Sequence, residues 1–264
     1  MSTAGSPPAM HAINGLQIEI LTQGNGKPLL FLHPELGLDP AAPVVERLSS
    51  GARIIAPSHP GFGRSEVAKS QTTVDDLAYF YLDLLDALDL RDAALVGVSF
   101  GAWIAAEIAI KSTARLSHLV LAGAVGIKVG DRETRDIPDI FAMTESQYLE
   151  LAYADPAIAK VDYTTRPEAE LNIVARNREA TARYAWSPYM HDPKLKGRLH
   201  RIRIPTLVLW GDKDRLTAPE YGRAYAAAIP EARFELIGAC GHFPHIEQPD
   251  AFAQKVLGFI GGRK

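Results

Sequence analysis

The stretch ALVGVSFGAW, residues Ala94–Trp103, places one serine between two glycines directly after an apolar run. The apolar letters predict a buried strand, and FGAWIAAEIAIK, Phe100–Lys111, predicts a helix. A tight turn from strand to helix strains its central residue and crowds the side chains two positions away on either side. Gly97 and Gly101 relieve that crowding, so Ser99 is expected to project from the turn.

The predicted surroundings of Ser99 suit a nucleophile. In open α/β sheets, ligands bind at the carboxyl ends of the strands, which is where this turn lies. The following helix directs its positive N-terminal end and its free amides at the same place. A serine hydroxyl is a weak nucleophile until a base takes its proton, so the rest of the chain must supply that base.

Apolar runs alternate with helix-spaced segments over most of the chain. This alternation predicts a mostly parallel sheet with helices on both faces. The pair Asn14-Gly15 between two apolar runs predicts an antiparallel hairpin at the start. Further strands are expected at 28–33, 53–59, 93–98, 116–124, 205–211 and 232–238, and helices at 73–90, 100–111, 219–229 and 249–260.

One segment, 127–201, interrupts this rhythm, because it lacks clear strands and contains five of the nine tyrosines. A structureless loop of that length is improbable, so we expect a helical insertion. The core is then formed by 1–126 and 202–264, with 1–10 as a flexible tail. The tyrosines of the insertion either attach it to the core or line a pocket.

Composition excludes several classes of protein. A net charge of −3 gives no electrostatic footprint for nucleic acid or for an anionic membrane. One cysteine, Cys240, cannot form an internal disulfide, and no apolar stretch approaches the ~18 residues of a spanning helix. The first residues, MSTAGSPPAM, do not resemble a signal peptide. We therefore expect a soluble, cytoplasmic protein that acts on a small molecule, with a homodimer left open.

No cofactor is expected. No spacing of histidine, cysteine and aspartate suggests a metal site. Gly24 and Gly26 have no phosphate-loop lysine and serine after them, so this segment is interpreted as a turn.

Five motifs, in this order, resemble those of the α/β-hydrolase superfamily. The resemblance covers nearly the whole chain and implies that the insertion is a helical cap, or lid, over the active site. The motifs are FLHPELG (31–37), APSHPGFGRS (56–65), GVSFG (97–101), LWGDKDRLTAP (209–219) and GACGHFPHIEQP (238–249).

The resemblance implies a catalytic triad of Ser99, Asp214 and His242. His242 follows a glycine as in the family, and His245, three residues later, is its rival. The imidazole needs a carboxylate to fix its tautomer, and the family position falls on Asp214. Asp212 is expected to cap the loop or to face water.

The oxyanion that forms on the substrate needs donors already in place. The amide of Phe100 is one, and by motif position the amide of Glu35 is the other. Many relatives have glycine where this chain has Pro34, which offers no N–H. The Glu35 side chain could face the site, but exposure to solvent is the preferred interpretation. His33, Pro34 and Phe243 are the expected pocket residues.

These residues support a serine hydrolase that cleaves small to medium apolar carboxylic esters through an acyl-enzyme on Ser99. The same residues could cleave a carbon–carbon bond, as the meta-cleavage product hydrolases of this family do, or open an enol-lactone. A third hypothesis, from another class, is a binding or receptor protein that keeps the fold without catalysis.

Overall fold

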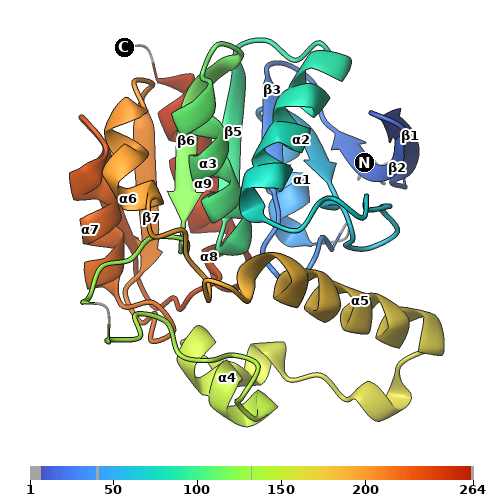
Figure 1. The fold of residues 1–264 in the computed structure, drawn as a ribbon, viewed down its shortest axis with the longest axis vertical. Coiled ribbons are helices and arrows are strands. Elements are labelled where there is room, and N and C mark those ends of the chain that lie inside the picture. Colours follow the sequence, from blue (N-terminus) through green and yellow to red (C-terminus); the bar gives the residue numbers. More distant parts are fainter. Residues whose placement is uncertain (1–6, 40–41, 132, 263–264) are drawn as a thin grey trace.

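The computed structural model describes residues 7–39, 42–131 and 133–262. Within them, eight strands form one sheet in the order β1-β2-β4-β3-β5-β6-β7-β8 (Figure 1). The hairpin pair β1·β2 is antiparallel, as expected, and β2·β4 is antiparallel too. The other pairs are parallel, so the sheet is mostly parallel as predicted. The strands are β1 (Ala9–Ile13), β2 (Leu16–Gln23), β3 (Pro28–Leu32), β4 (Arg53–Pro57), β5 (Ala93–Val98), β6 (Leu116–Ala122), β7 (Thr206–Gly211) and β8 (Arg233–Ile237).

Helices cover both faces of the sheet, which confirms the predicted fold class. On one face, α2 (Val74–Ala87), α3 (Phe100–Lys111) and α7 (Pro219–Ala228) share a core cluster with inward-facing strand residues. On the other face, α1 (Pro43–Ser49) and α9 (Pro249–Gly261) share a second cluster. A short α8 (Pro244–Glu247) precedes α9. Helix α1 was not predicted, because seven residues are too few to show a helical period.

The predicted hairpin is present, and it shortens the predicted tail. Asn14 and Gly15 have φ angles of 48° and 80° and connect β1 to β2. Ala9 and Met10 already pair with Ile20 and Glu19 of β2, so the expectation of a flexible tail over 1–10 is wrong for these two residues. Residues 1–6 lie outside the described residues.

The segment 127–201 contributes helices and no strand to the described structure. It contains α4 (Glu145–Ala152), the 3₁₀ helices η1 (Pro156–Ala159) and η2 (Tyr163–Thr165), and α5 (Glu168–Ala185), followed by α6 (Leu195–Arg198) and η3 (Leu199–Arg201). Helices α4 and α5 lie beyond the carboxyl ends of the parallel strands (Figure 1). In contrast, Leu195 and Leu199 pack into the core cluster beside α3. The described part of the chain has no helix long and apolar enough to cross a membrane.

Candidate active site

Ser99 occupies a strained turn between β5 and α3. Its φ of 50° and ψ of −115° lie in a region that residues with side chains rarely adopt. A Cβ atom on Gly97 would overlap the carbonyl oxygen of Gly101, and one on Gly101 would overlap that of Leu32. The crowding predicted around the serine is therefore real, and only glycine fits on either side.

Three side chains from distant parts of the sequence form one hydrogen-bonded chain. Ser99 Oγ lies 2.9 Å from His242 Nε2, and His242 Nδ1 lies 2.8 Å from Asp214 Oδ2. All three side chains are buried. Ser99 follows β5, Asp214 follows β7 and His242 follows β8, so the parallel sheet brings the three loops together at its carboxyl edge.

The Asp214 carboxylate is held by its own loop. Its Oδ1 accepts hydrogen bonds from the amides of Leu216 and Thr217 at 3.0 and 2.9 Å. The Thr217 hydroxyl donates to Oδ2 at 2.9 Å and lies 3.0 Å from His242 Nδ1. Sequence reasoning missed this use of Thr217, although the residue stands three positions after the aspartate in the quoted motif.

The electrostatics of His242 suit a general base. Burial lowers the pKa of His242, but the charge and hydrogen bond of Asp214 outweigh burial and raise that pKa above its ordinary value of 6.5. Because Nδ1–H donates to Asp214, the lone pair of the neutral ring lies on Nε2, on the side of Ser99. His242 can therefore take the serine proton and hold it as an imidazolium beside Asp214.

The two rival residues lie elsewhere. His245 is buried between aromatic rings, and its Nδ1 has no hydrogen-bond partner among the described residues. Burial lowers the pKa of His245 to about 3, so the ring stays neutral. Asp212 accepts a hydrogen bond from the Cys240 amide at 3.2 Å, which agrees with the loop-capping expectation. Cys240 is buried, and burial raises the pKa of its thiol, which makes it a poor nucleophile.

The loop after β3 holds the Glu35 amide in a fixed direction. The Pro34 carbonyl oxygen accepts hydrogen bonds from His33 Nδ1 at 2.6 Å and from the Gly37 amide at 3.1 Å. In a trans peptide the C=O and the next N–H point in opposite directions, so anchoring the Pro34 oxygen fixes the Glu35 N–H. Neither this amide nor that of Phe100 donates to another group within the described ranges.

His33 is part of the floor of the site and has no nitrogen left for a substrate. Its Nε2 accepts from the His59 amide at 3.0 Å, which leaves the proton on Nδ1 for Pro34. Burial lowers the pKa of His33 to about 4, so the ring remains neutral and keeps this tautomer. His59 in turn donates from Nε2 to the His33 carbonyl and accepts from the Tyr81 hydroxyl. His33 is thus held against the loop that follows β3.

Helix α5 fixes the same loop from above. The buried side chain of Asn177 donates to the Leu36 carbonyl and accepts from the Gly63 amide, both at 2.9 Å. It therefore connects the loops that follow β3 and β4. The Arg176 guanidinium donates to the carbonyls of Gly61 and Ser65 beside it. Nothing in the sequence points to Asn177, because its partners are more than a hundred positions away.

The five tyrosines of the segment 127–201 divide between packing and the site. Tyr184 donates to the Pro60 carbonyl, Tyr189 donates to the Pro138 carbonyl, and Tyr163 is exposed. The Tyr153 ring packs against Phe243, whose own ring centroid lies 4.9 Å from that of His242. Tyr148 alone among the five bonds to a residue that contacts Ser99.

That residue is Glu35, and the expectation of solvent exposure for its side chain is wrong. The carboxyl group is buried, with Oε2 2.7 Å from Ser99 Oγ. The Tyr148 hydroxyl donates to Oε1 at 3.2 Å. That expectation rests on the usual solvation of a glutamate in a surface loop. Here Tyr148 of α4 and Thr181 of α5 contact Glu35, and its side chain is buried.

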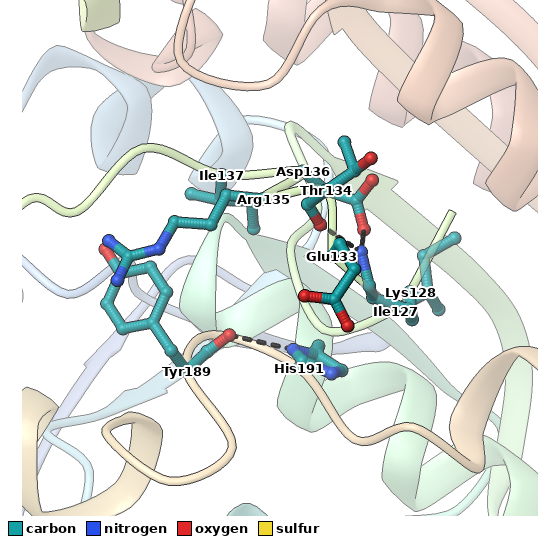
Figure 2. A pocket seen from close by; sticks show the side chains of 9 residues that line it. All are labelled: Ile127, Lys128, Glu133, Thr134, Arg135, Asp136, Ile137, Tyr189 and His191. Carbon is teal, nitrogen blue, oxygen red and sulfur yellow. Dashed lines mark hydrogen bonds and ion pairs between the residues drawn. The ribbon is translucent and has the colours of Figure 1, made fainter. Parts of the chain in front are cut away.

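A cavity of about 240 Å³ lies at the start of the segment 127–201, away from these residues. Figure 2 shows its walls, formed by 127–128, 133–137, Tyr189 and His191. Its Lys128 and Asp136 form an ion pair at 2.8 Å, and His191 Nδ1 donates to the Tyr189 carbonyl. Neither Ser99 nor Glu35 borders this cavity. Within the described residues, no group of three or more possible ligands could hold a metal ion.

Comparison with known proteins gives a consistent result. The model of the alpha/beta hydrolase fold family matches residues 27–249. The 2-hydroxymuconate semialdehyde hydrolase of Pseudomonas putida is 27% identical over 270 residues, covering 93% of this chain and 91% of that protein. The 3-oxoadipate enol-lactonase 1 of Acinetobacter baylyi is 27% identical, with coverages of 93% and 92%. A meta-cleavage product hydrolase structure from Pseudomonas fluorescens IP01 superposes with a TM-score of 0.75 at 21% identity, over 96% and 97% of the chains.

Proposed function

The chain belongs to the α/β-hydrolase fold family and is a hydrolase, and from this premise we propose that it cleaves a small molecule through an acyl-enzyme on Ser99. The observation that carries the proposal is the hydrogen-bonded chain from Ser99 through His242 to Asp214. Such a chain in a strained, buried turn argues against a non-catalytic binding protein.

The chemistry follows from the geometry. As Ser99 Oγ adds to a substrate carbonyl carbon, its proton passes to His242 Nε2, and Asp214 stabilises the imidazolium. The charge that develops on the carbonyl oxygen is stabilised by the amides of Phe100 and Glu35. The tetrahedral intermediate then expels the leaving atom, and water releases the acyl group from Ser99. His242 gives the proton to the leaving atom, then takes a proton from the attacking water and returns it to Ser99 Oγ.

For the substrate we propose a carbon–carbon bond next to a carbonyl, or an enol-lactone, in preference to a simple carboxylic ester. The support comes from the relatives, which are named as hydrolases of 2-hydroxymuconate semialdehyde, of 2-hydroxy-6-oxo-dienoates and of an enol-lactone. At 25–29% identity these names indicate a reaction class more than a particular compound. The ester hydrolase expected first from the sequence has less support than this alternative.

A panel of substrates tests this choice. We expect kcat/KM to be about tenfold or more higher for a 2-hydroxy-6-oxo-dienoate or an enol-lactone than for ethyl butyrate. The physical reason is that contacts in the pocket stabilise the transition state of a substrate that fits it more than the transition state of ethyl butyrate. Initial rates with the purified chain measure it. A preference for ethyl butyrate would return the assignment to simple esters, and a preference for emulsified long-chain triglycerides would contradict both.

The pH profile tests the role of His242. We expect kcat/KM to rise with pH through a midpoint above 6.5, because the base must be neutral and Asp214 raises the pKa of His242 despite burial. The measurement is kcat/KM for p-nitrophenyl butyrate between about pH 5 and pH 9. His245→Gln is the control and should leave the midpoint in place, since His245 is neutral throughout this range. A midpoint below 6.5 would count against His242 as the base.

A further inference from the structure

The carboxyl end of α4 lies against the two loops that carry Asp214 and His242. The last carbonyl groups of a helix have no amide partner within the helix itself. In α4 two of them are taken up by these loops. The Ala152 carbonyl accepts from the His242 amide at 2.6 Å, and the Leu151 carbonyl accepts from the Arg215 amide at 3.1 Å. The end of α4 is therefore bonded to the backbone of His242 and to the residue that follows Asp214.

The side chain of Arg215 strengthens this contact. Its guanidinium donates from Nε to the Glu150 carbonyl at 2.8 Å and from Nη2 to the Tyr153 carbonyl at 3.0 Å. Nη2 also contacts the Glu150 carbonyl oxygen. A cation at the carboxyl end of a helix is favoured by the helix dipole as well as by these hydrogen bonds. The residue next to Asp214 thus spans the end of α4 with both its backbone and its side chain.

The carboxylate of Glu247 makes a similar contact on the side of His242. Its Oε2 accepts from the Gly241 amide at 2.5 Å, and its Oε1 accepts from the Ala154 amide at 2.8 Å. One carboxylate therefore joins the residue before His242 to the chain just after α4. A Cβ atom on Gly241 would overlap the Ala152 carbonyl oxygen, so the close approach of this loop to α4 requires glycine.

The hydrogen bond between Asp214 and His242 needs a fixed separation of their two loops. The loops bond to each other directly through the Lys213 amide and the Cys240 carbonyl at 2.8 Å, but this bond precedes both residues in the chain. The end of α4 instead holds His242 itself and the residue after Asp214. A misplacement of about 1 Å in a catalytic group can lower the rate by about 10²-fold. Contacts that fix these two loops therefore act on the rate of the reaction.

We propose that Arg215 and Glu247 are positioning residues of the site, which hold Asp214 and His242 at hydrogen-bonding distance by fixing both loops to the end of α4. This inference rests on the proposed function, because it concerns the rate at which Ser99 is acylated and deacylated. It makes the end of α4 a fixed part of the active site, so that a movement of α4 away from the core would displace His242.

Glu247→Gln tests the contact beside His242. Glutamine keeps the size of the side chain, but its NH₂ group cannot accept a hydrogen bond, so one of the two amides loses its partner. We expect kcat for p-nitrophenyl butyrate to fall by about 10- to 100-fold. KM should stay within about threefold of the wild-type value, because the bound substrate does not contact Glu247.

Titration of active sites separates positioning from folding. A fluorophosphonate probe, followed to completion by intact-protein mass spectrometry, counts the chains whose Ser99 is reactive, and kcat is then expressed per titrated site. A merely structural role of Glu247 would lower the titrated fraction and leave kcat per site at the wild-type value. A positioning role lowers kcat per site.

Arg215→Met tests the contact beside Asp214 with the same readout. Methionine removes the guanidinium donors, and we expect kcat per titrated site to fall by about tenfold or more with KM little changed. Arg215→Lys keeps the charge and one donor group and should recover part of this loss. The matched control is Lys213→Met in the same loop, whose exposed side chain lies 3.9 Å from Asp212. It should leave kcat per site unchanged.

Each result decides the question. Wild-type kcat per titrated site in Glu247→Gln and Arg215→Met would overturn the positioning role and leave the acyl-enzyme on Ser99 in place. If these variants do not fold, the milder Glu247→Asp and Arg215→Lys are read in the same way, and undiminished kcat per site in both would overturn the role. A wild-type chain that forms no acyl-enzyme would instead refute the proposed function.

Discussion

Ser99→Ala should lower kcat by about six orders of magnitude. In the structure Ser99 Oγ lies 2.9 Å from His242 Nε2, and alanine leaves neither a nucleophile nor a proton for His242 to accept. The same change should abolish labelling by a fluorophosphonate probe. Labelling is read by intact-protein mass spectrometry, and turnover with an enol-lactone and p-nitrophenyl butyrate.

The control for this prediction is Ser70→Ala, which changes an exposed serine in the loop before α2. It should keep both labelling and turnover. Thermal unfolding of the two variants should be compared, because the strained φ at position 99 affects stability independently of chemistry. Undiminished hydrolysis by folded Ser99→Ala would remove the basis for the whole assignment.

Asp214→Asn should cost about 10⁴ in kcat, equivalent to roughly 5 kcal/mol of barrier. Asparagine fills the same space but cannot stabilise an imidazolium. Its NH₂ group, once placed toward His242, also favours the tautomer with the proton on Nε2, which blocks acceptance from Ser99. The measurement is kcat on folded protein, with the circular dichroism spectrum compared with that of the wild type.

Asp212→Asn is the matched control. Asp212 accepts one hydrogen bond from the Cys240 amide, so its replacement should cost about 1 kcal/mol of stability and little activity. If Asp212→Asn were the variant with the large loss in kcat, the carboxylate that supports His242 would be placed wrongly by two residues.

The sequence alone was sufficient for the architecture. The spacing of apolar residues identifies each strand and each helix from its own residues, so it is local information. The alternation of strands with helices then predicts a mostly parallel sheet. The turn at Ser99 was likewise predictable, since Gly97 and Gly101 meet a steric demand that the neighbouring backbone creates. The order of the five motifs also predicted which aspartate and which histidine the structure places beside Ser99.

The direction of the Glu35 side chain was not predictable in this way. Its carboxyl group contacts Ser99, 64 positions away, and Tyr148, 113 positions away. The exposed or buried state of Glu35 depends on whether α4 covers the loop after β3, and nothing within that loop encodes the position of α4. Thr217 and Asn177 were missed for a related reason, because each acts through a partner that only folding brings near.

The sequence by itself therefore determined the sheet and the strained turn, because short-range sterics and apolar periodicity specify them, and its resemblance to the α/β-hydrolase motifs predicted the three residues of the hydrogen-bonded chain. The tertiary structure decided what surrounds Ser99: the Pro34–Glu35 peptide anchored by His33, the loop held by Asn177, and a buried carboxyl group at the nucleophile. The contacts of Glu35 and Asn177 join segments far apart in the chain, because α4 and α5 lie over the carboxyl edge of the sheet (Figure 1).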